Sequence, residues 1–333
     1  MPVFGKAPHL EDALGSILGQ SLKSWKLCIV LDRPSPATLD LAISFSASEP
    51  RISFIESLRP GISAALNLGI SVSHSKFIAR LDSDDMMAPN RLATQLREME
   101  KDPRLVVLGS QSLYVDDMGI EIGRSHLPQS KVSIRYHLPI HNVVSHPTVM
   151  MSRAAVIEVG GYNPLYDGVE DYLLWLQLSR IGDIRNCGSC LTAYRVHSSQ
   201  FTATRGQMIR LLACMARLNY FLSPVKPTGE RWIDTNREKA LADKKAVIVG
   251  AENLMSRQLR RQLIFARLVG EARNQSMPKA LSRFVAAALL NPAGFLKLGL
   301  MHFGSRLVYG AWRKPTGTRR RNIRTLPEGW YWS

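Results

Sequence analysis

Short apolar runs alternate with amphipathic segments through the first two hundred residues. Residues 27–31 form a continuous apolar run typical of a central parallel strand, and residues 10–20 repeat leucine and isoleucine at helical spacing. The alternation predicts an α/β fold of doubly wound order, with a mostly parallel sheet flanked by helices. The same criteria predict strands at residues 2–4, 52–55, 76–79, 105–108 and 192–196, and helices at 37–46, 62–71, 171–181 and from Pro89 onward.

The pattern changes near residue 202. We predict one domain over residues 1–202, in which the regular alternation ends near 115 and the less regular part, 116–202, supplies the acceptor side of a cleft. Residues 203–333 are predicted to be basic and helical, with long helices at 206–222 and 236–274. The charge-free run from 284 to 296 is too short to span a bilayer, so no transmembrane helix is expected.

All of the excess positive charge behind the net charge of +16 lies in residues 203–333. Residues 1–202 hold 19 basic and 20 acidic side chains, whereas residues 203–333 hold 24 and 7. We expect no nucleic acid partner, because neither interleaved aromatic residues nor a reading motif is evident. Apolar residues facing a basic side favour an anionic membrane surface. The alternative is a solvated basic face or a helical subdomain packed on the first domain.

Cysteine use and the start of the sequence bear on the compartment. Four cysteines give no disulfide framework, and Cys187 and Cys190 lack a second pair or nearby histidines at zinc spacing. Lys6, Glu11 and Asp12 interrupt any apolar signal run. We therefore expect a reducing, cytoplasmic location. The basic region adds the expectation of a peripheral position on the inner face of a membrane.

Three carboxylates directly follow the strand predicted at residues 76–79. Asp82, Asp84 and Asp85 occupy four consecutive positions with Ser83. Carboxylates this close raise one another's pKa unless a cation or hydrogen bonds compensate. Hard cations prefer oxygen ligands, so the cluster favours Mn²⁺ or Mg²⁺ beside a phosphorylated substrate at the carboxyl end of a strand. The alternative is a solvated acidic turn that caps the helix starting near Pro89.

Nine motifs follow one another along the first domain. They are Pro2-Val3-Phe4-Gly5, Ser16–Ser21, Asp32 after its strand, Gly61–Asn67, Arg80–Asp85 with Pro89 and Arg91-Leu92, His146–Met150, Gly160-Gly161-Tyr162, Glu170–Trp175, and Tyr194–His197. In this order they resemble the family 2 glycosyltransferases, and most of all the bacterial enzymes that build exopolysaccharide and lipopolysaccharide chains. Two positions depart from the family pattern, since Gly5 replaces an asparagine and Arg33-Pro34 extends the loop after Asp32.

The resemblance implies a GT-A fold and a metal-dependent, inverting transfer from a nucleoside diphosphate sugar. The nucleotide-sugar-binding half would be residues 1–115 and the acceptor-binding half residues 116–202. A UDP-sugar is the expected donor. A glycan or a polyprenyl-diphosphate-linked glycan in surface polysaccharide synthesis is the expected acceptor.

The resemblance also assigns roles to particular residues. Asp84 would coordinate the metal, Asp171 would act as general base, and Glu170 would orient Asp171 or the acceptor. Acids also favour a helix N-terminus, and that capping role is compatible with catalysis. The expected nucleotide-sugar contacts are Pro2, Val3, Phe4, Asp32, Asn67, Asp82 and Ser83, and the expected acceptor or diphosphate contacts are His146, Trp175, Arg195 and His197.

Two other functions compete with sugar transfer. A nucleotidyltransferase acting on sugar phosphates would share the acidic cluster, yet it brings a glycine-rich phosphate loop that Gly5-Lys6 does not supply. A nucleic-acid-binding protein would explain only the basic region. Sugar transfer alone accounts for both the acidic cluster and the later Glu170-Asp171 pair.

Overall fold

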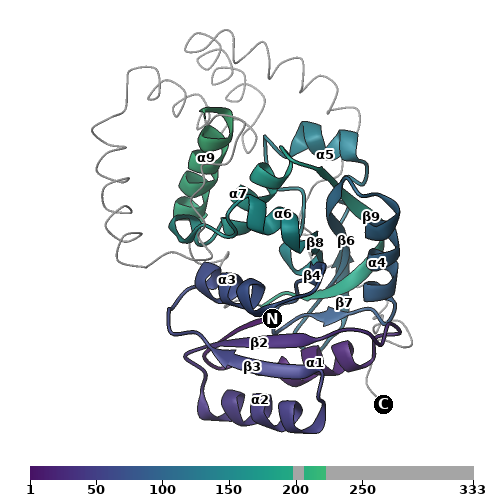
Figure 1. The fold of residues 1–333 in the computed structure, drawn as a ribbon, viewed down its shortest axis with the longest axis vertical. Coiled ribbons are helices and arrows are strands. Elements are labelled where there is room, and N and C mark those ends of the chain that lie inside the picture. Colours follow the sequence, from purple (N-terminus) through teal and green to yellow (C-terminus); the bar gives the residue numbers. More distant parts are fainter. Residues whose placement is uncertain (198–205, 223–333) are drawn as a thin grey trace. The chain divides into compact units, whose positions relative to one another are not determined.

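The computed structural model describes residues 1–197 and 206–222, which belong to one compact unit (Figure 1). The helical stretches expected at 236–274 and the apolar run at 284–296 lie outside the described residues. Within the described part, no helix combines the length and hydropathy of a membrane span. The elements of the first layer are β1 (Pro2–Phe4), α1 (Leu10–Leu18), β2 (Leu27–Asp32), α2 (Pro36–Ser48), β3 (Ile52–Glu56) and α3 (Ile62–Val72).

Three parallel strands form the first sheet in chain order, β1-β2-β3. Phe4 lies opposite Asp32 in this register, so the carboxyl ends of β1 and β2 meet at one edge. Ile29 and Leu31 of β2 have no exposed surface. They are buried because helices cover both faces, and Figure 1 shows α2 and α3 on opposite sides of the β2–β3 layer. This layer confirms the predicted doubly wound order.

A second, mixed sheet follows, with the order β4-β8-β6-β9-β5 and β7 paired to β6. Only β6 and β9 are parallel in it, and its other pairings are antiparallel. Parallel pairing therefore predominates in the first sheet and not in the second. The elements are β4 (Phe77–Ala79), β5 (Met86–Met87), α4 (Arg91–Lys101), β6 (Leu105–Val115), β7 (Glu121–Arg124), α5 (Lys131–His137), η1 (His146–Thr148), β8 (Met150–Ser152), α6 (Arg153–Glu158), η2 (Pro164–Tyr166), α7 (Glu170–Leu178), β9 (Asp183–Arg195) and α9 (Gly206–Leu222).

Strand β9 is much longer than the strand predicted at residues 192–196. Its first half carries Asp183, Arg185 and Asn186, which hid the strand pattern in the sequence. Asn186 nevertheless points inward, where its amide donates to the carbonyl oxygens of Pro128 and Val143 at 2.8 and 2.9 Å. Hydrogen bonds to loop carbonyls thus replace the apolar contacts that a strand prediction relies on.

Helix α9 confirms the helix predicted at residues 206–222, and it packs against α7 (Figure 1). Ala216 is fully buried in the core that also contains Trp175 and Leu176 of α7. Arg217 donates to the carbonyl oxygen of Ile140 at 2.6 Å. For this helix, the alternative of packing on the first domain is correct.

Arg91 is a buried cation that joins α4 to the end of β4. Its side chain has no exposed surface, and one guanidinium nitrogen donates to the carbonyl oxygens of Arg80 and Val149 at 2.8 and 3.2 Å. A second nitrogen donates to Gln95 at 3.0 Å. Burial lowers the pKa of Arg91 to about 9. This contact fixes the backbone two residues before Asp82.

We expect Arg91→Leu to lower the free energy of unfolding by about 2–4 kcal/mol, because the Arg80 carbonyl and the Gln95 side chain lose their buried partner. Urea denaturation measures this loss. Arg97→Leu removes an exposed arginine from the same helix and should stay within about 0.5 kcal/mol of the unchanged protein. Equal midpoints for the two variants would contradict the assignment.

Candidate functional site

The acidic cluster forms a tight turn between β4 and β5. The Asp85 amide donates to the Asp82 carbonyl at 3.3 Å, which closes the turn. On either side the chain is held in the second sheet, since Ala79 pairs with β8 and Met86 pairs with β9. One carboxylate oxygen from each of Asp82, Asp84 and Asp85 lies within 4.8 Å of the others. The sequence prediction that these groups converge is therefore confirmed.

Each carboxylate of the cluster has a different environment. Asp82 forms an ion pair with Arg80, and Asp84 Oδ2 accepts a hydrogen bond from Nε2 of His197 at 2.9 Å. Asp85 accepts the backbone N–H of Arg195 at 2.9 Å through Oδ1. Its other oxygen, Oδ2, is buried with no hydrogen-bond partner among the described residues.

Burial and mutual repulsion disfavour the charged form of two carboxylates in the cluster, in spite of the positive charge of Arg80. Burial, followed by repulsion from Asp82 and Asp84, raises the pKa of Asp85 well above its ordinary value. Burial also raises the pKa of Asp82, although Arg80 opposes the rise. An unpartnered buried oxygen and three converging oxygen donors suit a hard divalent cation. The donor set therefore fits Mn²⁺ or Mg²⁺.

Arg195 organises the acidic turn rather than lining a ligand site. It is 2% exposed, and its Nε donates to the Asp84 carbonyl oxygen at 3.0 Å. Its two terminal nitrogens donate to the Asp117 carbonyl at 2.7 Å and to the Asp12 carboxylate at 3.0 Å. Burial places the Arg195 guanidinium inside the protein, and its expected contact with acceptor or diphosphate stays a prediction.

The nucleotide-side residues gather where β1 and β2 end. Pro2 and Val3 are buried, whereas the Phe4 ring is 63% exposed and lies 4.9 Å from the Arg33 guanidinium. Ser83 is half-buried within the acidic turn. Phe4 is therefore the residue of this edge best placed to meet a ligand through its ring.

Asp32 is 5% exposed and already bonded at both oxygens. Oδ1 pairs with Nε of Arg33 at 3.0 Å, and Oδ2 accepts the Gly61 amide at 2.9 Å. Arg33 adopts a positive φ of 50°, a backbone strain that the sequence did not reveal. A base N–H that reaches Asp32 has to share or replace the Arg33 contact.

The second acidic pair opens helix α7. Glu170 is buried, accepts the Gly168 amide at 2.6 Å and lies 3.7 Å from Nδ1 of His146. Burial, followed by repulsion from Asp171, raises the pKa of Glu170 to about 8. Asp171 is half-buried and accepts hydrogen bonds from the Asn142 amide at 2.8 Å and the Tyr172 N–H at 2.6 Å. Burial raises the pKa of Asp171 as well.

Arg80 links the two acidic groups. Its guanidinium pairs with Asp82, and its charge also opposes the rise in the pKa of Asp171 and lowers that of His146. Both carboxylate groups therefore lie within electrostatic reach of one buried cation. Arg80 belongs to the Arg80–Asp85 motif, but the sequence pattern alone indicates no role for it.

Three other expected contact residues are buried in the core. His146 bonds the Tyr162 hydroxyl at 2.8 Å, Trp175 is 0% exposed, and burial holds the pKa of His146 well below its ordinary value. Asn67 bonds both the amide and the carbonyl of Tyr162, at 2.9 and 2.8 Å. In this structure these three side chains are buried, and their expected contacts with a ligand stay predictions.

The start of helix α3 joins the two halves of the site. The Gly61 amide bonds Asp32, and the Ser63 amide bonds Asp167 in the loop before Glu170, at 3.3 Å. A Cβ on Gly61 would lie 2.8 Å from Asp167, and the φ of 117° favours glycine. Sequence reasoning missed Asp167 and Asn142, because neither stands in a motif and their partners lie more than twenty residues away.

Comparisons with known proteins agree with this architecture. The model of the family described as glycosyl transferase family 2 matches residues 1–160. The amylovoran biosynthesis glycosyltransferase AmsE of Erwinia amylovora is 29% identical over 204 residues, which cover 60% of this chain and 76% of that protein. The chondroitin synthase of Escherichia coli is 24% identical over 193 residues, 56% of this chain but 27% of that longer protein.

A solved structure shows the same fold. The structure of S. aureus TarS 1-349 in complex with UDP-GlcNAc superposes with a TM-score of 0.54 at 13% identity, and it covers 80% of this chain and 77% of that chain. The expected GT-A fold is thereby confirmed. The family match and the relatives together show that residues 1–160 are similar to glycosyl transferase family 2.

Proposed function

We propose that the protein is an inverting glycosyltransferase that moves a sugar from a nucleoside diphosphate donor to a glycan acceptor. One observation supports the proposal. Three converging carboxylates of the acidic turn and the half-buried carboxylate of Asp171 both lie near enough to Arg80 to interact with its charge. The first group suits a diphosphate with its metal, and the second suits a proton acceptor.

Asp171 is the proposed general base. Inversion in one displacement needs a carboxylate that takes the acceptor hydroxyl proton during attack on the anomeric carbon. The raised pKa of Asp171 moves it toward the range in which a base works at neutral pH, and the Asn142 amide holds its orientation. Glu170 is buried beside it and holds the turn at Gly168, so we assign it a positioning role.

Asp84 is the proposed metal ligand, with Asp82 directed to the donor's ribose. Asp84 is half-buried with 31% of its side chain exposed, whereas Asp85 is 1% exposed and tied to Arg195. A divalent cation bound here would neutralise charge on the leaving diphosphate. His197, which already contacts Asp84, is a candidate second contact to that group.

The proposed donor is a UDP-sugar. Asp32 at the end of β2 offers an acceptor for the N3–H of uracil once Arg33 moves from Oδ1, and the exposed Phe4 ring offers a stacking surface. The relative from Erwinia amylovora is named for polysaccharide synthesis. We extend that context to this chain and propose a polysaccharide or lipid-linked glycan acceptor, with residues 203–333 drawing the protein to an anionic membrane surface.

The central test separates donor binding from transfer. Asp84→Ala should lose metal-dependent nucleotide binding by calorimetry with UDP, GDP and dTDP, with and without Mn²⁺. Asp171→Asn should keep donor affinity within about threefold, because the base acts only in the chemical step. Its rate of diphosphate release should fall about 10²- to 10⁴-fold.

Asp40→Asn, at an exposed position of α2, is the matched control and should leave both quantities unchanged. Transfer that persists in Asp171→Asn would remove the base assignment. Nucleotide binding that ignores Mn²⁺ in the unchanged protein would remove the metal assignment.

Glu170 gives a prediction about pH. Its pKa is about 8 in the folded protein against an ordinary value of 4.5, so between these values the folded state binds more protons than the unfolded state. Stability should therefore fall as pH rises through this window, by at most about 1.4 kcal/mol per pH unit. Glu170→Gln should flatten this slope in unfolding experiments. Glu158→Gln, at an exposed position of α6, should not.

The membrane proposal has its own measurement. The full chain should sediment with vesicles that contain anionic lipid at low salt and should be released as salt rises, since screening weakens the attraction of basic side chains. Failure to sediment at low salt would remove the proposed role of residues 203–333 without touching the catalytic proposal.

A further inference from the structure

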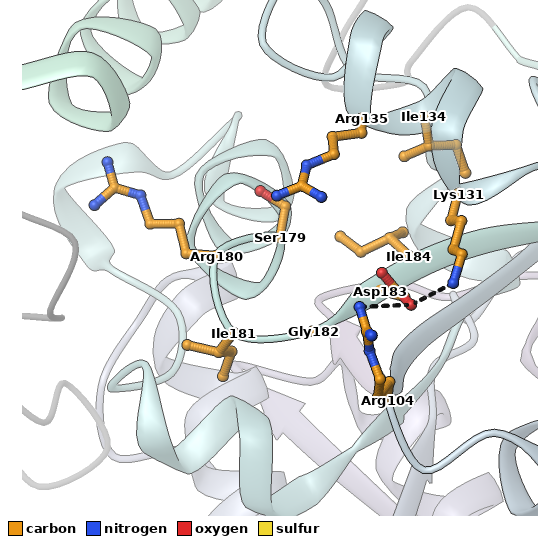
Figure 2. Close-up of a pocket in the computed structure, with 10 residues that line it drawn as sticks. All are labelled: Arg104, Lys131, Ile134, Arg135, Ser179, Arg180, Ile181, Gly182, Asp183 and Ile184. Atoms are coloured by element: carbon orange, nitrogen blue, oxygen red, sulfur yellow. Dashed lines mark hydrogen bonds and ion pairs between the residues drawn. The ribbon is translucent and has the colours of Figure 1, made fainter.

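A hollow lies at the end of α7 opposite Glu170 and Asp171. It is lined by α5, by the loop before β6 and by the turn from α7 to β9, and its volume is about 150 Å³ (Figure 2). Glu170 and Asp171 stand at the first turn of the nine-residue α7, whereas Ser179 to Gly182 follow its last turn. At 1.5 Å per residue, about 13 Å of helix separates the two places.

Positive charge dominates the hollow. Asp183, whose side chain is 12% exposed, is shared by Lys131 at 3.0 Å and Arg104 at 3.6 Å. Arg135 forms no hydrogen bond or ion pair with any of the described residues, and Figure 2 shows its side chain directed toward Ser179. Arg104, Lys131 and Arg135 thus place three positive charges beside one carboxylate, and Arg180 also lines the hollow. An anion that enters the hollow would meet at least one uncompensated guanidinium.

The hollow depends on a glycine. A Cβ at Gly182 would lie 2.3 Å from a methyl carbon of Val106 and 2.9 Å from the Arg104 carbonyl oxygen, so only glycine lets the turn pass close to β6. The space left is several times the 30 Å³ that a water molecule occupies in the liquid. It is large enough for a phosphate group.

The outer side of α5 adds an apolar element. Val132 and Tyr136 are 59% and 57% exposed, and their spacing of four residues places them on one side of the helix. Lys131 and Arg135 have the same spacing and form the neighbouring row. An exposed apolar row beside a basic row is the arrangement that helices use at the bilayer interface.

We propose that this hollow binds the phosphate headgroup of an anionic membrane lipid. Arg135, Lys131 and Arg104 donate hydrogen bonds to the phosphate, and Val132 and Tyr136 enter the boundary of the acyl chains. The site lies at the other end of α7 from Glu170 and Asp171. Lipid bound in this hollow would give the catalytic domain a fixed orientation on the membrane. General electrostatic attraction of a basic segment would not fix the orientation.

The test compares two arginines in the full chain. Arg135→Ala and Arg97→Ala each remove one exposed charge, so the general attraction of the protein to an anionic surface changes equally. Sedimentation at physiological salt uses vesicles of phosphatidylcholine alone or mixed with phosphatidic acid. We expect Arg135→Ala to weaken binding to the mixed vesicles about fivefold, and Arg97→Ala to leave it near that of the unchanged protein.

Unaltered thermal unfolding of both variants without ligand serves as the folding control, since neither arginine has a described polar partner. Equal sedimentation of the two variants would overturn the proposal. A soluble arm uses glycerol 3-phosphate and thermal unfolding. If it stabilises the unchanged protein but not Arg135→Ala while the vesicles do not distinguish the variants, the ligand is a soluble phosphate and the lipid assignment fails.

Discussion

Compensation of three crowded carboxylates is the constraint on which the rest of the structure depends. Asp82, Asp84 and Asp85 share one turn, and the protein supplies Arg80 and Arg195 to hold it. The Arg195 guanidinium also donates hydrogen bonds to a backbone carbonyl and to Asp12. One carboxylate oxygen of Asp85 is buried without a hydrogen-bond partner among the described residues. Negative charge on the three carboxylates is therefore only partly compensated in the folded protein. A bound divalent cation would compensate the rest.

Interactions of Arg80 and of the first turn of α3 connect the two halves of the domain. Arg80 acts on Asp82 and on Asp171, and Arg91 holds the Arg80 carbonyl from α4. On the other side of the site, the first turn of α3 bonds both Asp32 and Asp167. Hydrogen bonds from the start of α3 thus join the end of β2 that carries Asp32 to the loop that precedes α7.

Sequence patterns predicted the features of this fold that depend on residues close together in the chain. The apolar run of β2, the carboxylates after β4 and the acids opening α7 could be found because each depends on neighbours in the chain. Polar contacts between residues far apart in the chain could not be found from the sequence. Trp175 and His146 carry side chains suited to a ligand site, yet tertiary packing buries both, and Arg195 bonds partners from residue 12 to residue 117. Strand β9 was predicted too short because Asn186 satisfies its inward position with hydrogen bonds instead of apolar surface.

The most direct measurement of the central claim is an anomalous diffraction map of crystals grown with Mn²⁺ and UDP. We predict a manganese peak in coordination contact with the Asp84 carboxylate and with the diphosphate, on the same side of the domain as Asp171. A map in which UDP binds without such a peak, and in which Asp84 still contacts only His197, would contradict the account.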